Sequence, residues 1–472
     1  MDSRPLRSML LFALLGTALA LRLLLAYVIL PDSGHPGDLY WYSRWALTLA
    51  RVGPGEFYAV NPETDYPPGY LYVLWLVGYV SQALASAMGT DVQRLCISLL
   101  KLPPMLLDIG AGFLIYRIAR YCTTETRTTE RTALVAAAVY VFNPVVLYDS
   151  VIWGQTDAAG AFVALLGLVS LLKWPPEASA SIAVITALVK PQFGVIVTPL
   201  IGIVLFRRYC WPGIDSPRLD SKPHGMQSGA PLRILTSFVA ATVVFYAIVI
   251  PFNLTAEPFF QRMVETARYF HFLSVNALNP WAMVGSGHSP ALVFAGLGNW
   301  PYDDIPLVGR LTGVTIGAAL LMVGFIVGAV RLMLRDDWRS IILVGAYLSL
   351  CFFVLPTRVH ERYVFLAFAF IPILAAFDRK WLWATLLLTI GSLMNLHAVL
   401  THAILIHPVP RVSVTETLLR IPLSSFLRSP EGMLISIVLQ TAVFLFALGS
   451  LRPGTLRADA KNSDILTPVD AA

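Results

Sequence analysis

The chain has 472 residues, of which 57% are hydrophobic and 13% are charged, and its formal net charge is +6. Soluble domains carry about 25% charged residues, and long apolar runs recur along this whole chain, so the composition excludes a soluble globular protein. Strands of alternating polarity are missing, which excludes a membrane β-barrel. Because helices satisfy the backbone in lipid, we predict an all-α polytopic membrane protein.

The charged residues and the cysteines exclude two further classes. The lysines and arginines fall at the ends of apolar runs, where they set membrane orientation, and they do not indicate a nucleic-acid partner. The four cysteines are scattered, with no CxxC and no His/Cys ligand spacing. We therefore expect neither a disulfide framework nor a zinc site.

The first predicted span covers residues 8–30. Arg4 and Arg7 precede it, and Ala18-Leu19-Ala20 resembles a signal-peptide cleavage site. The apolar run nevertheless continues to Leu30, about the 20 residues that a span needs. We expect a retained span with a cytoplasmic N-terminus, in which Arg22 faces the bundle or snorkels to the interface.

Residues 31–98 form a large first outer loop. Within it, residues 38–52 are predicted as a short amphipathic helix. Residues 69–88 are apolar enough to span, but the next run, 99–117, ends among Arg117, Arg120, Arg127 and Arg131. The positive-inside rule makes that end cytoplasmic, so we place 69–88 in the outer interface.

The remaining apolar runs alternate in orientation. A proline and a costly mid-membrane lysine, at Lys190-Pro191-Gln192, divide the run 178–206 into two shortened helices that meet on the outer side. We predict about twelve spans in a single domain, 1–451, with a second large outer loop at 253–306 (the fourth outer loop) and a disordered cytoplasmic tail at 452–472. The later spans are 132–149, 158–173, the two halves of 178–206, 233–252, 311–330, 340–355, 363–377, 381–400 and 431–451.

This topology places the unusual polar residues on one side of the membrane. They are Asp38, Asp65, Gln155, Asp157, Lys190, His360, Glu361 and Arg362. Span lengths and basic loops alone define this topology, so the common location of these residues is evidence for one site.

Asp38 could serve as a catalytic base. A carboxylate within hydrogen-bond reach of a hydroxyl can take its proton, and burial beside Tyr40 and Trp41 would raise its pKa. The alternative is structural, since Asp38 precedes the amphipathic helix and Asp is a favoured N-cap.

The other polar residues also have two interpretations. Lys190, His360 and Arg362 suit a phosphate, but Lys190 could snorkel and His360-Glu361-Arg362 could form a local salt bridge. Asp65 and the Thr156-Asp157 pair could be helix caps. The candidate sugar-binding residues are Trp153, which offers a ring face, together with Gln155, Asp157, Glu361 and Asp65. Further candidate lining residues are Arg262, Arg268, His271, Asn276, Asn279 and Trp281, and Asp303-Asp304 is a weak metal doublet.

Five motifs occur in one order between residues 37 and 363: Gly37-Asp38-Leu39-Tyr40, Asp65-Tyr66-Pro67-Pro68, Asn143-Pro144 with Trp153-Gly154-Gln155-Thr156-Asp157, Lys190-Pro191-Gln192, and Val359-His360-Glu361-Arg362-Tyr363. Together they resemble the integral-membrane GT-C glycosyltransferases. The resemblance is to the bacterial relatives of the second mannosyltransferase of GPI-anchor synthesis and, more distantly, to the dolichyl-phosphate-glucose-dependent glucosyltransferases.

The resemblance implies a function. Asp38 would be the general base of an inverting glycosyltransferase with a polyprenyl-phosphate-sugar donor, with mannose the first candidate sugar. His360 and Arg362 would lie near the donor phosphate, with Lys190 beside them. No metal cofactor is implied. The acceptor would be a lipid-linked or glycan hydroxyl at the outer face of a bacterial cell membrane, and we expect a monomer.

The first loop departs from the metal-using branch of this superfamily, because no second acidic residue stands close to Asp38. Two alternatives remain. The first is a secondary transporter or flippase of a lipid-linked sugar, whose site would lie nearer the membrane midplane. The second is a polypeptide-modifying GT-C enzyme.

Overall fold

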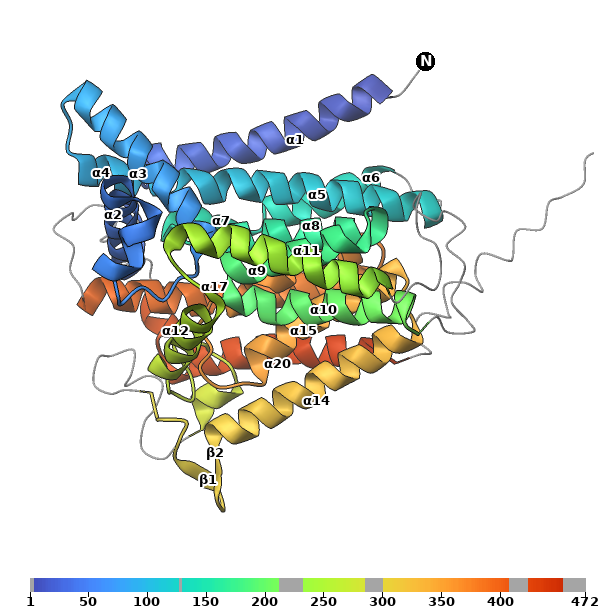
Figure 1. Cartoon of the computed structure of the whole chain (residues 1–472). Coiled ribbons are helices and arrows are strands. Elements are labelled where there is room, and N and C mark those ends of the chain that lie inside the picture. The colour runs from blue at the N-terminus through green and yellow to red at the C-terminus, as the bar shows by residue number, and fades with distance from the viewer. Residues whose placement is uncertain (1–3, 127–129, 212–231, 285–299, 407–422, 453–472) are drawn as a thin grey trace, which may run out of the picture.

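The computed structural model describes residues 4–126, 130–211, 232–284, 300–406 and 423–452. The predicted tail beyond residue 452, most of the inner loop 207–232, and parts of the segments 253–306 and 401–430 lie outside the described residues. Figure 1 shows that most long helices run side by side along one direction, while α2 (Pro36–Val60) and α12 (Ala256–Tyr269) gather at one end of the bundle.

The described elements are almost entirely helical. The other α-helices are α1 Arg4–Leu24, α3 Pro68–Met88, α4 Val92–Leu100, α5 Leu102–Thr126, α6 Glu130–Val141, α7 Pro144–Leu147, α8 Asp157–Lys173, α9 Pro176–Val189, α10 Pro191–Tyr209, α11 Leu232–Val249, α14 Gly313–Leu334, α15 Trp338–Val354, α16 Ala367–Ala375, α17 Arg379–Ile406, α19 Leu423–Leu427 and α20 Pro430–Ser450. Two π-helical turns are η1 Leu25–Ile29 and η2 Tyr148–Trp153; three 3₁₀ turns are η3 Ile250–Phe252, η4 Pro280–Met283 and η5 Tyr363–Leu366. A small antiparallel hairpin joins β1 Pro306–Val308 to β2 Leu311–Thr312.

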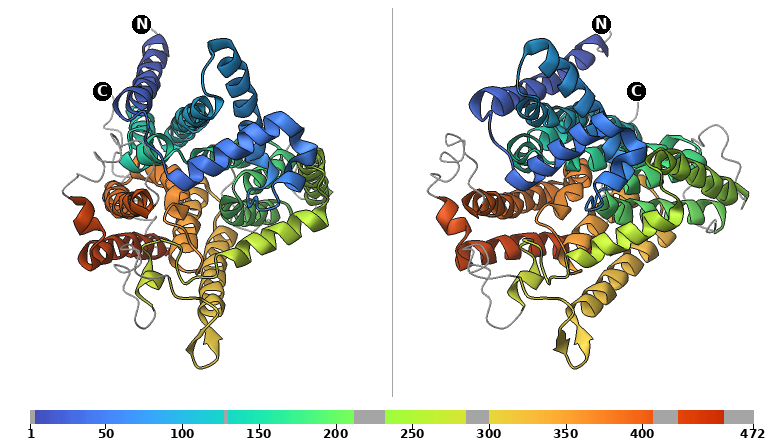
Figure 2. Two further views of the ribbon diagram at one scale, coloured as in Figure 1. Left: turned by 90° about the vertical axis from the view of Figure 1, so that its left-hand side faces the viewer. Right: turned by 60° about the vertical axis from the view of Figure 1, so that its left-hand side comes forward.

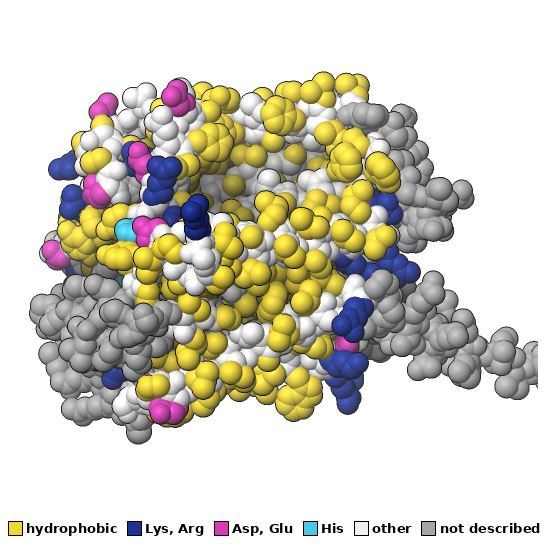
Figure 3. All heavy atoms as spheres, turned by 90° about the horizontal axis from the view of Figure 1, so that it is seen from below, with side chains coloured by type: hydrophobic (Ala, Val, Ile, Leu, Met, Phe, Trp, Pro, Cys, Tyr) yellow, Lys and Arg dark blue, Asp and Glu magenta, His cyan; other side chains and the backbone are white. Residues whose placement is uncertain are grey.

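The prediction of an all-α polytopic protein is confirmed. Among the described residues, eight helices are long and apolar enough to cross a membrane, or nine if the bent pair 130–153 counts as one span. The shorter helices α8, α9, α15 and α16 occupy the other positions where the sequence predicts spans. Figure 3 shows a broad apolar face between two more polar ends.

Two local predictions have different outcomes. The break at Lys190 is confirmed, because α9 ends at Val189 and α10 begins at Pro191. The interfacial assignment of residues 69–88 stays a prediction, because α3 has the length and composition of a span, which the sequence already indicated, and these two properties alone do not place it in the membrane.

Close helix contacts near Lys190 depend on glycine. A Cβ at Gly160 of α8 would collide with the ring of Phe193 in α10. A Cβ at Gly69 of α3 would collide with the carbonyl group of Leu188 in α9. The bare backbone at these two positions therefore lets α3 and α8 approach the break between α9 and α10.

Arg22 of α1 faces the bundle, which was one of the two expectations for it. Its side chain is fully buried, and its Nε lies 3.4 Å from Oδ2 of Asp108 in α5. The guanidinium also donates to the carbonyl oxygen of Val141 at 2.8 Å, and Tyr140 donates to Asp108 at 3.0 Å. A buried ion pair therefore ties the first span to α5 and α6.

The second outer segment packs against the segment that follows α15. Arg358 has a φ of 64° and binds Asp303 with two nitrogens, at 2.7 and 3.0 Å. Thr357 donates to the same carboxylate at 2.7 Å. Asp303 thus anchors this segment.

Removing one partner of the Arg22–Asp108 pair should destabilise the protein more than removing both. Arg22→Leu or Asp108→Leu leaves one buried charge unpaired, which costs about 3–5 kcal/mol. The double variant buries neither charge, and we expect it to recover most of that loss. Chemical unfolding in detergent, followed by tryptophan fluorescence, measures the three free energies. Additive losses in the double variant would contradict the pairing.

Candidate active site

Asp38 lies in the first turn of α2, and His35 caps that helix. The imidazole Nδ1 of His35 accepts the backbone N–H of Asp38 at 3.2 Å, and Pro36 occupies the first helical position. The interpretation of Asp38 as the N-cap is therefore wrong. Its carboxylate is left available for contacts with other elements.

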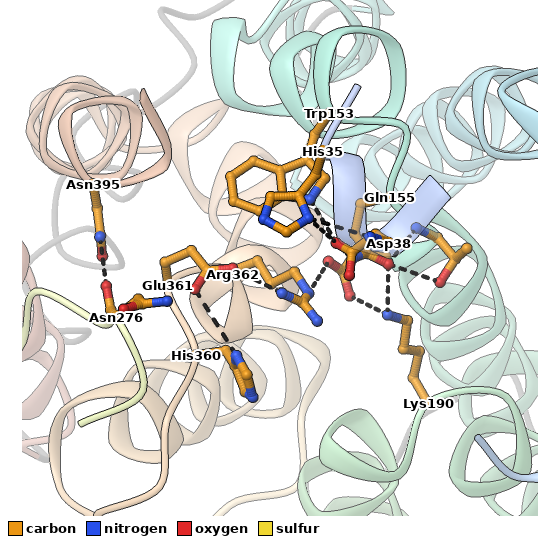
Figure 4. A network of polar contacts seen from close by, with 12 residues as sticks. His35, Asp38, Trp153, Gln155, Lys190, Asn276, His360, Glu361, Arg362 and Asn395 are labelled. Carbon is orange, nitrogen blue, oxygen red and sulfur yellow. Dashed lines mark hydrogen bonds and ion pairs between the residues drawn. The ribbon is translucent and has the colours of Figure 1, made fainter. Parts of the chain in front are cut away.

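Two donors from the segment after α7 hold the Asp38 carboxylate. Trp153 Nε1 donates to Oδ2 at 2.7 Å, and Gln155 Nε2 donates to the same oxygen at 2.9 Å (Figure 4). The indole of Trp153 is 1% exposed and stacks on His35 at 4.9 Å between ring centres. Trp153 therefore positions Asp38, and it does not offer the free ring face that we expected for a sugar.

The environment of Asp38 makes it an ionised carboxylate. Burial raises its pKa, but His35 and Arg362 together with the Trp153 hydrogen bond outweigh burial and lower the pKa to about 2. The expectation of a raised pKa is therefore wrong. Tyr40 and Trp41, the residues that we expected to bury Asp38, are themselves 52% and 36% exposed.

Gln155 links Asp38 to a cation. Gly154, with a φ of 81°, turns the chain out of η2, and the fully buried Gln155 follows. Its Oε1 accepts from Tyr42 at 2.5 Å and from Lys190 at 3.3 Å. One amide thus bridges the carboxylate on α2 and the ammonium at the α9–α10 break.

Lys190 and Asp157 form a buried ion pair. Lys190 Nζ lies 3.0 Å from Asp157 Oδ1 and donates to the hydroxyl of Tyr66 at 2.9 Å. Both side chains are at most 2% exposed, so Lys190 does not snorkel. Thr156 makes no side-chain capping bond at the start of α8, and Asp157 binds a cation, so the capping interpretation of this pair is wrong.

The segment after α15 brings Arg362 to the same cluster. The N–H of Val275 donates to the carbonyl oxygen of Val359 at 2.9 Å, which pairs this segment with the second outer loop. Arg362 Nη1 donates to Glu361 at 2.7 Å, and its Nε lies 3.8 Å from Asp157 Oδ2. The predicted local salt bridge exists, and Arg362 also reaches the Asp157–Lys190 pair.

His360 and Glu361 have shifted pKa values. Burial and the charge of Arg362 lower the pKa of His360 well below its usual value, so its imidazole is neutral at pH 7. Burial raises the pKa of Glu361. His360 can therefore donate a hydrogen bond, whereas Arg362 and Lys190 carry the positive charge.

Asp65 and Arg262 lie at the edge of the cluster. Burial raises the pKa of Asp65, and the N-cap position of α3 is Pro67 without a side-chain bond, so Asp65 does not cap that helix. Arg262 of α12 donates to the carbonyl oxygens of Pro62 and Thr64 at 2.8 and 3.0 Å. The Arg262 guanidinium therefore stabilises the turn before Tyr66 and is not directed at a substrate.

The other candidates of the second outer loop make structural contacts. Trp300 donates to the Asn276 side chain at 2.8 Å, and Asn395 donates to the Asn276 carbonyl oxygen at 2.8 Å. Asn279 donates to the backbone carbonyl oxygen of Phe353 in α15. Trp281 donates to the carbonyl oxygen of Leu355, just beyond that helix. His271 stacks on Tyr302. None of these contacts brings a loop candidate to the Asp38 carboxylate.

Sequence reasoning missed two buried carboxylates, Asp108 and Asp149. Each lies within a predicted apolar run, where a charge is rare and usually functional. Their positions within the runs 99–117 and 132–149 were the signal that could have identified them.

Comparisons with known proteins give limited similarities. Residues 66–282 match the family described as GPI transamidase subunit PIG-U. This stretch is less than half of the chain, and it contains neither Asp38 nor Arg362. No curated protein matches the chain.

Two solved structures of oligosaccharyltransferases from Archaeoglobus fulgidus are also similar. The first, AglB in complex with an inhibitory peptide and a dolichol-phosphate, has 15% identity and a TM-score of 0.43, and the match covers 92% of this chain and 56% of that one. The second, the apo form, has 12% identity and a TM-score of 0.41, covering 97% and 60%. The chain thus spans less than two thirds of their length, and likeness at these scores carries no argument about function.

The low pKa of Asp38 should appear as a pH-dependent contribution to stability. A carboxyl group whose pKa falls from 3.8 to about 2 on folding stabilises the protein above pH 4. That contribution, about 2 kcal/mol, is lost as the pH falls toward 2. The difference in free energy of unfolding between wild type and Asp38→Asn should therefore shrink in acid, measured by denaturant titration in detergent.

Asp65→Asn is the matched control, because burial raises the pKa of Asp65. A raised carboxyl pKa reverses the sign, so wild type should lose stability relative to Asp65→Asn as the pH rises. The same acid dependence in both variants would contradict the assignment for Asp38.

Proposed function

We propose that the protein is an inverting GT-C glycosyltransferase that moves a sugar, with mannose as the first candidate, from a polyprenyl-phosphate donor to a hydroxyl of a lipid-linked or glycan acceptor. The observation that carries the proposal is the arrangement of Asp38. Its carboxylate is fixed by two donors on Oδ2 and lies in one cluster with Arg362 and Lys190. An ionised carboxylate beside fixed cations suits a reaction that removes a proton and releases a phosphate.

The free form of Asp38 is a weak base, and donor binding would strengthen it. A donor phosphate near Arg362 and Lys190 would offset the positive charge that lowers the Asp38 pKa. The negative charge of the phosphate would also disfavour the ionised form of the nearby Asp38 carboxyl. We therefore expect the pKa of Asp38 to rise when the donor binds, toward the range in which proton transfer from a hydroxyl is effective.

The cations would stabilise the leaving phosphate. Arg362 is held by Glu361 and Asp157, so its guanidinium is oriented before any substrate arrives. Fixed donors aimed at developing negative charge lower a reaction barrier without reorganisation. The neutral imidazole of His360 would add one hydrogen bond. We propose no metal cofactor for this step.

The location and the partners are part of the same proposal. Helix α2, whose first turn carries Asp38, lies at one end of the bundle, opposite the end where the chain begins (Figures 1 and 2). With a cytoplasmic N-terminus, that end is the outer face of a bacterial cell membrane. We propose that a single copy of the chain suffices.

A second candidate function is favoured by the match to the GPI transamidase subunit family. In this alternative the protein binds a lipid-linked glycan within a larger assembly and catalyses no transfer. The matching stretch includes Gln155, Asp157 and Lys190, but Asp38 and Arg362 lie outside it. The two functions therefore differ in whether Asp38 is needed for chemistry.

The test is sugar transfer from a short-chain polyprenyl-phosphate-mannose, with chelator present. We expect wild type to form a glycosylated lipid or glycan, detected by mass spectrometry. Asp38→Asn should be folded and slower by about 10²–10⁴-fold, because positioned proton transfer contributes that much. Asp336→Asn, which removes a carboxylate paired with Arg208 outside the cluster, should keep most of the activity.

The outcomes separate the alternatives. A folded Asp38→Asn variant with wild-type transfer would show that Asp38 is only structural. If wild type transfers no polyprenyl-phosphate sugar to any acceptor in a broad panel, the subunit function takes precedence. In that case, accessibility of Asp38 from both membrane sides in turn would identify a transporter or flippase.

A further inference from the structure

The two oxygens of the Asp38 carboxylate have different surroundings. Oδ2 accepts hydrogen bonds from Trp153 and Gln155 and lies 3.6 Å from Nδ1 of His35. Oδ1 accepts no hydrogen bond from the residues that the structure describes. Because the Asp38 side chain is 21% exposed, Oδ1 is the oxygen left for a ligand.

The orientation of the Gln155 amide is fixed by its neighbours. Oε1 accepts from the backbone N–H of Thr156 at 2.8 Å and from the ammonium of Lys190 at 3.3 Å. Both of these groups can only donate, so the opposite orientation would set the amide NH₂ against two donors. Nε2 therefore faces Asp38, to which it donates at 2.9 Å (Figure 4).

Two tyrosine hydroxyls connect Lys190 to the same amide. The Tyr66 oxygen accepts from Lys190 at 2.9 Å, and the Tyr42 and Tyr66 hydroxyls lie 2.7 Å apart. Tyr42 donates to Oε1 of Gln155 at 2.5 Å, and burial raises the pKa of Tyr42, so its hydroxyl keeps the proton for this bond. Since a tyrosine hydroxyl has one hydrogen, Tyr66 must donate to Tyr42.

All donors in this chain of hydrogen bonds therefore point the same way. In order, the donors are Lys190, Tyr66, Tyr42 and Gln155, and the final acceptor is Oδ2 of Asp38. The two ends are fixed by their chemistry, because an ammonium only donates and an ionised carboxylate only accepts. Hydrogen bonds in such a chain polarise and strengthen one another, so the tyrosines strengthen the bond from Gln155 to Oδ2.

We propose that Oδ1 of Asp38 is the atom that takes the proton, and that Tyr42 and Tyr66 are positioning residues that act on Asp38 through Gln155. This role rests on the proposed transferase function, whereas the chain of hydrogen bonds does not. In the reaction, the acceptor oxygen bonds to the anomeric carbon, the phosphate leaves with the electron pair of the broken C–O bond, and the hydroxyl proton passes to Oδ1. With Oδ2 held by two donors, Oδ1 keeps one direction.

A chain of hydrogen bonds predicts a pattern of effects that independent bonds do not. Tyr42→Phe and Tyr66→Phe each remove one hydroxyl and keep the ring, and either one interrupts the chain. The double variant interrupts the same chain, so its effect on Asp38 should equal that of one single variant instead of the sum. Tyr72→Phe is the control, because the Tyr72 hydroxyl donates to the carbonyl oxygen of Ile248, outside the chain.

The first measurement needs no enzymatic activity. In each background, the contribution of Asp38 is the difference in free energy of unfolding from the same protein with Asp38→Asn, and it is lost in acid. A weaker bond from Gln155 raises the pKa of Asp38 in the folded state, so this loss should be about threefold smaller in the unfolding equilibrium constant, the factor for a weak net hydrogen bond. We expect that result in both single variants and in the double variant, and no change in Tyr72→Phe. The charged and titratable groups around Asp38 stay in every variant: His35, Asp65, Lys190, His360, Glu361 and Arg362.

The second measurement is sugar transfer. Tyr42→Phe should lower kcat by about 3- to 10-fold, the factor for one net hydrogen bond. It should leave KM for the donor unchanged, because the Tyr42 hydroxyl binds neither Lys190 nor Arg362 among the described residues. The double variant with Tyr66→Phe should have the same kcat as Tyr42→Phe.

The two measurements separate the chain from the transferase function. Effects on the acid loss that add up in the double variant, or that are absent from both single variants, overturn the chain whether or not sugar is transferred. If wild type transfers no sugar, the proposed function and the role of Oδ1 fail together, and the acid measurement still decides the chain. A smaller acid loss with an unchanged kcat overturns the positioning role of Tyr42. If Tyr42→Phe does not fold, Tyr66→Phe decides alone.

Discussion

Lys190 and Asp157 are both buried in an apolar bundle, and neither charge could stay there alone. An isolated buried ion loses its hydration, and only a close counter-ion with further hydrogen bonds offsets that loss. Lys190 meets this condition through Asp157 at 3.0 Å, Tyr66 and Gln155. The other parts of the cluster depend on this pair, because Gln155 also binds Asp38 and Asp157 also faces Arg362.

The ion pair in turn depends on how closely the helices approach. The break between α9 and α10 frees the backbone around Lys190, and the bare backbone of Gly160 and Gly69 lets α8 and α3 come near it. Proline at the first position of α10 favours the break, since a proline inside a continuous helix would remove a hydrogen bond and clash with the preceding turn. Small residues and one proline thus place the charges, although they carry no charge themselves.

The electrostatics of the cluster are arranged before any ligand binds. Asp38 is kept ionised by neighbours that are themselves positioned by other groups: Trp153 by stacking on His35, and Arg362 by Glu361. Contacts of this kind, which orient the side chains around a site residue, determine how well the site is pre-formed. They also explain why the surface-exposed Tyr40 and Trp41 have little influence on Asp38, in spite of being its neighbours in the chain.

The sequence by itself determined the membrane class, the positions of most of the long apolar helices, the break at Lys190 and the set of polar residues at one end. Each of these follows from local patterns: apolar length, flanking arginines and proline. Only the tertiary structure decided the partners. It showed His35 instead of Asp38 as the cap, Trp153 as a buried donor, Asp303 as the anchor of Arg358, and Asp108 and Asp149 as buried acids. The physical reason is that a pKa, a buried ion pair or a hydrogen bond depends on groups that often lie far apart in the chain and meet only when the helices pack.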